Sequence, residues 1–493
     1  MPVACLESED ILLAILYWLD GQSITRCSSV CRRWYQTIKY STQLQYLVEL
    51  WADGLEPGPA RGYPVEELQA LLRRRRAWAT LDWSVRTNFP IIELPRAYEL
   101  VGGVFAQHNT WPQSDFTAIR LPSAGRAATI TAHENVGVES LDFAMDPTQD
   151  LVVFLHKTGE TGIFNVRALS TLQPHPLAAS PTLSFDLRDD QLLRIFLQVA
   201  DDVVGLLCRT SQLSEGSLRL VLFNWRTGRA LVDLAGPQLP RSLSDFALLS
   251  PRAYILASVN DAAYIPGMGE KGLGELHLFA FDGARGDEPD HVATLQLPRV
   301  RRERELERIV VHSGPFCARP IPGAPYSKSN EQRICVVSLS YDRGETYSVF
   351  VHHRYLARYL ANRDVPPTIP WEDWGRQHAR LLPGRRRLWL RYVHGERVVC
   401  PVDEAHPRRL EMLDFGIIPS RPGFDDVLPN SQLCVAPSTL SCADTVFQDD
   451  VTSSLPYRRS WRDLDQRHVL FLTDQDRIIG VKDAVDRLTV YAF

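Results

Sequence analysis

Apolar residues at the start of the chain recur with a helical period. The first run, Ile11, Leu12, Ile15, Leu16 and Leu19, predicts a helix with one continuous apolar face. Asp20 and Gly21 end this helix, and Ser23 can cap a second one. The second run has the same spacing and consists of Ile24, Cys27, Val30, Cys31, Trp34, Tyr35 and Ile38. Three short helices of this kind make a thin layer, so the rest of the chain or another protein must cover the apolar face.

Two further helical patterns follow this layer. Residues 41–51 place Leu44, Leu47, Val48 and Trp51 on one face. After a gap rich in glycine and proline, residues 64–83 begin with Pro64, a residue favoured at the first position of a helix. We therefore predict a small helical domain at residues 1–50 and a helical linker at residues 51–90. The linker would hold the next domain at a fixed distance and angle.

After Pro90 the pattern changes to short apolar runs separated by prolines and glycines, which is typical of strands and turns. These runs recur in six clear sets and one plausible set. Repeats of about four antiparallel strands, at ~40–60 residues each, are typical of a β-propeller. We predict a propeller of six to eight blades, with seven preferred, at residues 91–493. Two packed β-sandwiches are the alternative.

The end of the chain supports a closed ring. Residues 487–493, RLTVYAF, read as a strand, and pairing it with an early strand would remove two open sheet edges. Residues 223–234 resemble the end of a WD-repeat blade, with Trp225 before a turn and Gly228 in it. The glycine–histidine signature of WD repeats is absent from every set, so the domain is better described as propeller-like. We therefore expect an α+β multidomain protein. Residues 259–274, 318–332 and 417–460 are long and polar, so we expect loops there.

Composition narrows the functional classes. The 493 residues carry a formal net charge of −5, which favours neither nucleic acid nor an anionic membrane as a partner. The nine cysteines are scattered without CxxC or other zinc-type spacing, so we expect no metal, no cofactor and a reducing compartment, the cytosol or the nucleus. Cys27 and Cys31 are one helical turn apart in apolar surroundings, so we expect both to be buried. Neither a signal peptide nor an apolar run long enough to span a membrane is expected.

Several apparent active-site signals have simpler interpretations. Gly267, Gly269 and Gly272 satisfy G-x-G-x-x-G, but a strand follows them where a dinucleotide site needs a helix, which favours a hairpin loop. His352–His353 is typical of a satisfied surface pair. Trp371 and Trp374 are weak candidates for binding a target, because tryptophan often dominates binding hot spots, although core filling is the favoured interpretation.

The first forty residues also resemble an F-box. The ILLAIL helix at residues 11–16, the Leu19–Asp20 helix end and the VCRRWY run at residues 30–35 match that family in order and spacing. The usual leucine–proline opening is replaced by residues 5–8, CLES. Residues 64–83, which end in Leu81–Asp82–Trp83, resemble the leucine- and arginine-rich continuation of fungal F-box proteins.

The resemblance implies a substrate receptor of an SCF-type ubiquitin ligase, a subunit that is not itself catalytic. Its helices would bind a Skp-family adaptor, which bridges to a cullin, and the propeller would bind an unknown target protein. The residues implied in adaptor binding are Leu6, Ile11, Leu12, Ile15, Leu16, Leu19, Ile24, Cys27, Val30, Cys31, Trp34 and Tyr35.

Two other functions remain open at this point. The N-terminal helices could pack internally as a lid over a propeller scaffold that binds no adaptor. A propeller hydrolase comes third, since it would need acidic residues that converge at the ring centre.

Overall fold

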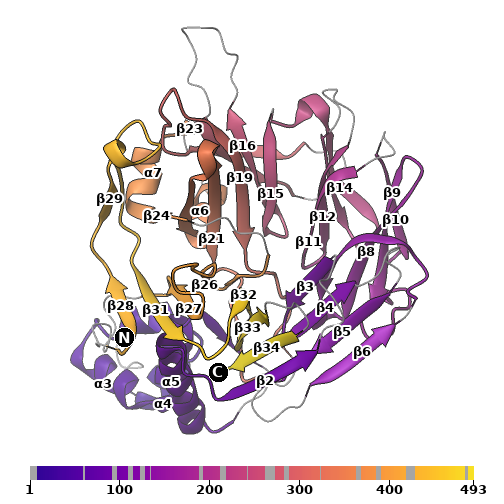
Figure 1. Ribbon diagram of the computed structural model, residues 1–493. Helices are drawn as coiled ribbons and strands as arrows, with labels where there is room; N and C mark the ends of the chain where they lie inside the picture. Colours follow the sequence, from indigo (N-terminus) through magenta and orange to yellow (C-terminus); the bar gives the residue numbers. More distant parts are fainter. Residues whose placement is uncertain are drawn as a thin grey trace, which may run out of the picture.

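The structure is a computed structural model that describes residues 8–58, 62–90, 97–108, 115–122, 128–133, 135–187, 192–210, 218–240, 242–260, 273–282, 288–321, 324–361, 368–384, 390–417, 428–482 and 487–493. Short helices gather at the N-terminal end of the chain, and strands build a ring from the rest (Figure 1). The α-helices of the described residues are α1 (Glu9–Leu16), α2 (Gly21–Cys27), α3 (Arg32–Tyr40), α4 (Thr42–Ala52), α5 (Pro64–Thr80), α6 (His353–Ala361) and α7 (Trp371–His378).

The first four helices form a small module with its own core. Asp20, rather than the expected Ser23, is the N-cap of α2, and its Oδ1 accepts a hydrogen bond from the Ser23 backbone N–H at 2.7 Å. A side chain at Gly21 would clash with Trp51 and with the Leu47 carbonyl, so glycine allows α2 to approach α4 closely. The fully or almost fully buried residues of this core are Leu12, Leu16, Ile24, Ile38 and Leu44.

The strands form a seven-bladed β-propeller, as the preferred blade count predicted. Blade 1 consists of β3 (Ala97–Val101), β4 (Val104–His108), β5 (Phe116–Arg120) and β6 (Thr129–His133). Blade 2 consists of β7 (Ser140–Asp146), β8 (Leu151–Thr158), β9 (Thr161–Ala168) and β10 (Thr182–Asp186). Blade 3 consists of β11 (Leu192–Ala200), β12 (Val203–Thr210), β13 (Leu218–Asn224) and β14 (Arg229–Ala235).

Blades 4 to 6 carry additions. Blade 4 consists of β15 (Leu243–Ser250), β16 (Ala253–Asn260), β17 (Leu273–Ala280) and β18 (Asp290–Gln296), extended by β23 (Thr368–Ile369). Blade 5 consists of β19 (Leu306–Ser313), β21 (Ile334–Tyr341), β22 (Thr346–His352) and β24 (Ala379–Pro383). Blade 6 consists of β25 (Val393–His394), β26 (Arg397–Val399), β27 (Arg409–Asp414) and β31 (Tyr457–Asp463), extended by β28 (Ser431–Cys434). β29 (Ser438–Leu440) pairs with β30 (Val451–Ser453) outside the blades.

The last blade closes the ring. It consists of β32 (His468–Thr473), β33 (Arg477–Lys482), β34 (Arg487–Ala492) and the early strand β2 (Val85–Pro90). Strand β2 is antiparallel to β34, with Val85 opposite Ala492 and Pro90 opposite Arg487. This pairing of the two ends of the domain is the closure that the C-terminal strand predicted. Strand β2 therefore belongs to a blade, although it lies within the range predicted as linker.

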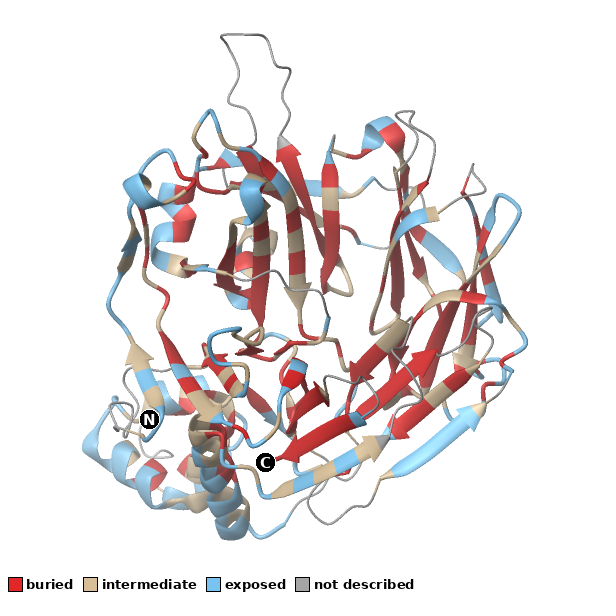
Figure 2. Cartoon of the chain, in the orientation of Figure 1, coloured by how far each residue is buried: buried red, intermediate tan, exposed pale blue. Residues whose placement is uncertain are grey.

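Apolar side chains between neighbouring blades hold the ring together. Each of the seven junctions contains a cluster of buried residues, so both faces of the blades are covered (Figure 2). Between blades 1 and 2, Phe116 packs edge-to-face against Phe143 and Phe154, with both ring centroids 5.3 Å away.

Two segments that the sequence suggested were long polar loops contain strands. Residues 318–332 include β20 (Tyr326–Lys328), and residues 417–460 include β28, β29, β30 and the start of β31. Most of the third expected loop, residues 259–274, lies outside the described residues. The strands in these segments are short and pair with distant partners, so their own residue pattern is weak.

Three contacts fix the helical module to one end of the propeller. Strand β1 (Leu55–Pro57) pairs antiparallel with β20. Trp78 of α5 is buried between blades 6 and 7 and stacks on Phe493, with ring centroids 4.0 Å apart. Arg74 Nε donates to Asp476 Oδ1 at 3.0 Å, and its Nη2 donates to the Gln475 carbonyl. These contacts hold the module at the end where the inner strands β19 and β32 finish.

Replacing Arg74 by methionine should weaken this attachment. Methionine keeps the apolar stem but leaves the Gln475 carbonyl and the Asp476 carboxylate without this donor, so we expect a loss of about 1–3 kcal/mol in the free energy of unfolding. Urea denaturation followed by circular dichroism measures it. Arg73→Met on the exposed side of the same helix is the matched control, and equal effects of the two variants would contradict the assignment.

Candidate functional site

Helix α1 carries two neighbouring apolar stripes, and only one of them is buried. Leu12 and Leu16 are completely buried in the core of the module. Ile11 and Ile15, one residue earlier in each case, are 44% and 41% exposed. The single continuous face predicted from the sequence is therefore divided: Leu12 and Leu16 hold the helices together, and the other stripe is left on the surface.

Trp18 extends the exposed stripe. It follows Ile11 by seven residues and Ile15 by three, a spacing that places the three side chains on one side of a helix, and it is 91% exposed. We refer to Ile11, Ile15 and Trp18 as the α1 ridge. Trp18 is not among the residues that the F-box resemblance implies in adaptor binding, although its helical spacing from Ile11 and Ile15 could have identified it.

A second group of exposed residues comes from α3 and its flanks. Val30, Tyr35 and Tyr40 are 65%, 48% and 78% exposed. The hydroxyl of Tyr17, directly after α1, lies 3.4 Å from Ser41 Oγ, which brings the end of α1 close to Tyr40. Lys39 Nζ lies 5.6 Å from the centre of the Tyr35 ring. Exposed tyrosine and tryptophan side chains are enriched at binding hot spots.

The other residues implied in adaptor binding have different positions. Ile24 is buried in the module core, and Leu19, Cys27 and Trp34 are half-buried against it. Cys31 is exposed, although apolar surroundings suggested that it would be buried with Cys27. Leu6 lies outside the described residues. Buried residues such as Leu12, Leu16 and Ile24 can support a binding surface but cannot contact a partner while the module stays folded.

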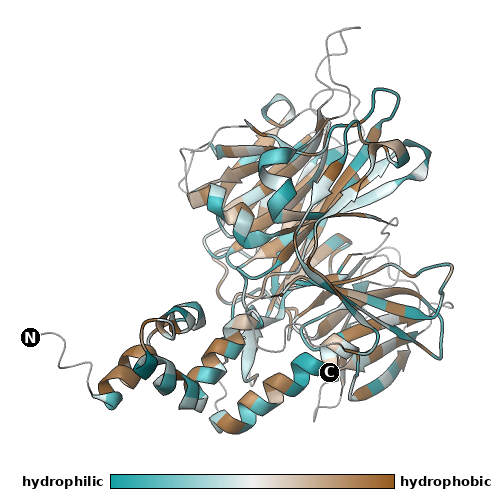
Figure 3. Cartoon of the chain, turned by 90° about the vertical axis from the view of Figure 1, so that its left-hand side faces the viewer, coloured by the Kyte–Doolittle hydropathy of each residue, from teal (hydrophilic) through white to brown (hydrophobic). Residues whose placement is uncertain are grey.

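The module does not cover the propeller. Its helices project beside the ring, with their outer faces turned away from the blades (Figure 3). An internal lid would bury Ile15 beneath the strands, whereas this residue is exposed. The attachment runs instead through β1, which pairs with β20, and through Trp78 of α5, which is buried between blades 6 and 7.

Trp371 and Trp374 do not form an exposed contact. Both lie in the buried cluster between blades 4 and 5, and Trp374 Nε1 donates to the Gln296 carbonyl at 2.8 Å. Helix α7 thus uses its two tryptophans to cover the outer part of this junction. In this structure neither side chain is available to a target protein, which agrees with the favoured interpretation as core filling.

The histidine pair is buried, not on the surface as expected. His352 Nδ1 lies 3.0 Å from Glu396 Oε1. His353 Nε2 donates to the Leu249 carbonyl at 2.6 Å, which joins α6 of blade 5 to blade 4. Burial and the charge of Arg333 lower the pKa of His353 to about 4. The pair therefore contributes to packing between blades.

No metal site or membrane span emerges from the described part of the chain. Its histidines, cysteines and carboxylates form no group of three or more that could hold a metal ion. None of its helices is long and apolar enough to cross a membrane. The glycines of G-x-G-x-x-G at residues 267–272 lie outside the described residues.

Comparisons with known proteins identify the N-terminal module. Residues 9–44 match the F-box-like family, so the chain contains an F-box-like domain followed by a seven-bladed propeller. A search of curated proteins finds no match to the chain.

Several solved structures are similar to the chain at low identity. The β-propeller domain of Cps50 (Swd1) from Myceliophteria thermophila is 8% identical, with 84% of this chain and 99% of that chain covered and a TM-score of 0.35. BamB from Moraxella catarrhalis is 10% identical, with 83% and 98% covered and a TM-score of 0.30. The propeller architecture described above depends on the strand pairing, not on these similarities.

Trp374→Ala and Trp18→Ala should separate the two roles of tryptophan. Trp374 is fully buried, so its replacement should lower the free energy of unfolding by about 3–5 kcal/mol. Trp18→Ala removes an exposed side chain and should change it by less than about 0.5 kcal/mol. Urea denaturation of the full chain measures both. Similar losses in the two variants would contradict these positions.

His353→Gln should reduce the acid sensitivity of the fold. The neutral imidazole is favoured in the folded protein, since the pKa falls from 6.5 to about 4. Its contribution to stability is therefore complete above pH 6.5 and is lost as the pH falls towards 4. Glutamine keeps a donor for the Leu249 carbonyl but does not titrate. The wild type should lose stability relative to the variant by up to about 1.4 kcal/mol per pH unit over this range. Urea denaturation at a series of pH values measures the free energy of unfolding of both proteins. Equal slopes of this free energy against pH for the wild type and the variant would contradict the prediction.

Proposed function

We propose that this chain is the substrate-receptor subunit of an SCF-type ubiquitin ligase. Its F-box-like domain would bind a Skp-family adaptor that connects it to a cullin, and its propeller would bind the protein to be modified. The chain itself would not be catalytic, because the ubiquitin-transfer steps belong to other subunits.

The α1 ridge is the observation that carries this proposal. An F-box-like segment leaves Ile11, Ile15 and Trp18 on the surface although its own core is complete without them. Exposed apolar side chains grouped in this way mark interaction sites in soluble proteins. The adaptor is the partner that an F-box-like domain generally binds.

The energy of adaptor binding requires more than the ridge. Ile11 and Ile15 are already more than half buried, so complete burial of the three ridge side chains supplies only roughly 3–5 kcal/mol in total. Association costs an estimated 4–15 kcal/mol in lost freedom of movement before any net affinity remains. We therefore propose that the second group, Val30, Tyr35 and Tyr40, joins the ridge in the interface.

Further parts of the proposal concern origin and location. The leucine- and arginine-rich α5, which ends close to Leu81–Asp82–Trp83, supports a fungal origin by its resemblance to that group of F-box proteins. A cytoplasmic or nuclear location follows from the proposed ligase role and from the scattered cysteines.

Co-purification of the full chain with a Skp-family adaptor tests the proposal. Ile15→Asp and Trp18→Asp place a carboxylate on the ridge, and the cost of burying it should reduce adaptor affinity at least about a hundredfold. Circular dichroism should show that both variants stay folded. Ile130→Asp, at an exposed apolar residue of propeller strand β6, is the matched control and should bind normally. Undiminished adaptor binding by the ridge variants would refute the proposed docking surface.

A further inference from the structure

The central channel of the propeller contains a cavity that the F-box-like domain does not explain. Its volume is about 190 Å³, more than ten times the roughly 10–15 Å³ that one ordered water requires. The inner strands of five consecutive blades, β3, β7, β11, β15 and β19, line it together with residues beside β25. Ligand sites in proteins are usually concave spaces of this kind, lined by apolar side chains with a few polar groups.

The two ends of this channel differ. Residues 314–321 and 324–333 run past the ends of inner strands from several blades: the Ala318 N–H donates to Asp146 Oδ2 of blade 2 at 3.0 Å, and Arg333 Nη2 donates to the Leu249 carbonyl of blade 4 at 2.8 Å. The same segment carries β20, which pairs with β1 of the linker. It crosses the channel at the end that faces the helical module. A guest would therefore enter from the opposite end.

Carboxyl groups gather near that opposite end, where the inner strands begin. Glu99, Asp142 and Asp245 line the cavity with Arg308 and Arg391, which leaves an excess of one negative charge when all five are ionised. Glu99 is held by Arg391, whose Nη2 lies 2.6 Å from Glu99 Oε1. Asp142 Oδ1 accepts from the Phe143 backbone N–H at 2.8 Å. Arg391 is thus paired with Glu99, and the two aspartates share the other arginine of the cavity lining, Arg308.

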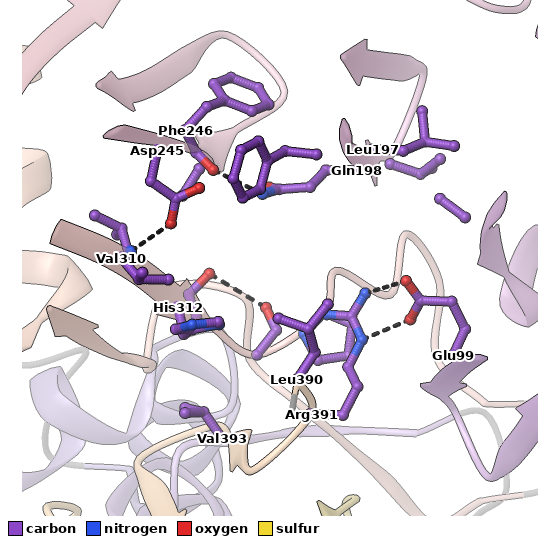
Figure 4. A pocket seen from close by; sticks show the side chains of 18 of the residues that line it. Glu99, Leu197, Gln198, Asp245, Phe246, Val310, His312, Leu390, Arg391 and Val393 are labelled. Carbon is purple, nitrogen blue, oxygen red and sulfur yellow. Dashed lines mark hydrogen bonds and ion pairs between the residues drawn. The ribbon is translucent and has the colours of Figure 1, made fainter. Parts of the chain in front are cut away.

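Asp245 points into this space with an incomplete set of partners. It is 2% exposed, and its Oδ2 accepts from the Val311 backbone N–H at 2.6 Å. Its Oδ1 has no hydrogen-bond partner among the described residues. Figure 4 shows Asp245 across the channel from the Glu99–Arg391 pair, with Gln198 between them. A buried carboxylate oxygen without a donor is costly, so a donor supplied by a guest would be stabilising.

We propose that the channel binds a basic side chain of the target protein, a lysine ammonium or an arginine guanidinium, with Asp245 as its carboxylate partner. The apolar stem of such a side chain fits between Ile195, Val310 and Leu390, which line the same cavity. A lysine ammonium carries three N–H donors and an arginine guanidinium carries five. Asp142 lines the same cavity as Asp245 and offers further acceptor oxygens. The described residues offer no group of three or more ligands for a metal ion. The inference rests on the proposed function only in naming the guest a target.

The charges around Asp245 predict how binding depends on pH. Burial raises the pKa of Asp245 to about 7, although Arg308 on β19 and Arg194 on β11 oppose this rise. Burial and the charge of Glu99 raise the pKa of Asp142 to about 7 as well, against the effect of Arg391. A cationic side chain binds the ionised carboxylates more strongly than the protonated ones. Its affinity should therefore increase from pH 6 to pH 8, and its binding in this range should release protons.

Binding of small amides to the full chain tests the proposal. The probes are the N-acetyl methylamides of arginine and lysine, each compared with its neutral counterpart, citrulline or Nε-acetyl-lysine, by saturation-transfer NMR at pH 7.5. At least one basic probe should bind roughly tenfold or more tightly than its neutral counterpart. Asp245→Asn keeps an acceptor for the Val311 N–H and should abolish this difference. Asp233→Asn, on the outer strand β14, is the matched control and should preserve it.

Three outcomes would overturn the inference. They are equal binding of the basic and neutral probes, unchanged binding by Asp245→Asn, and tighter binding of N-acetyl phosphoserine methylamide than of either basic probe. Absence of binding at millimolar concentration would be a fourth such outcome, because the channel would then hold water only. Trp18→Asp should bind the basic probes normally. Loss of adaptor docking and loss of channel binding can therefore be distinguished.

Discussion

The hydrophobic core of the N-terminal module is too small to bury all of its apolar side chains, and the proposed function depends on this constraint. The core that α1 to α4 form together buries one apolar stripe of α1, and Leu12 and Leu16 belong to this stripe. Because Ile11, Ile15 and Trp18 lie on the neighbouring side of the same helix, they cannot enter the same core. The propeller does not cover them either, since it is attached through β1 and α5. A partner is the remaining way to remove this surface from water.

The attachment places the helical module at one end of the propeller, away from the carboxyl groups of the channel. Arg74, Trp78 and the β1–β20 pair hold the module where the inner strands finish. Residues 314–321 and 324–333 cross the channel at that end, and the carboxyl groups of Asp142 and Asp245 lie near the other. A rigid connection of this kind would keep the proposed adaptor and the proposed target at a constant distance from each other. Ring closure through β2 and β34 places the linker next to the last blade and so contributes to the same geometry.

Periodic features could be predicted from the sequence, and features that depend on distant partners could not. The α1 helix, the repeating strand sets and the closing strand at residues 487–493 all have local patterns that the structure reproduces. The division of α1 into a buried and an exposed stripe could not be predicted, because Ile11 and Leu12 are equally apolar and packing against α2 and α4 decides between them. His352 and His353 appeared to be surface residues because their partners, Glu396 and Leu249, are far away in the chain. The channel was still more difficult to predict from the sequence, because Asp142 and Asp245 come from different blades and neither lies in a recognisable sequence motif.

The most direct measurement of the central claim is hydroxyl-radical footprinting of the full chain with and without a Skp-family adaptor. The adaptor should protect Trp18, Tyr35 and Tyr40, which are exposed in the isolated chain, and should leave the exposed Ile130 of the propeller equally reactive. Unchanged labelling of Trp18 in a complex that does form would show that the adaptor binds elsewhere, and the account of the α1 ridge would be wrong.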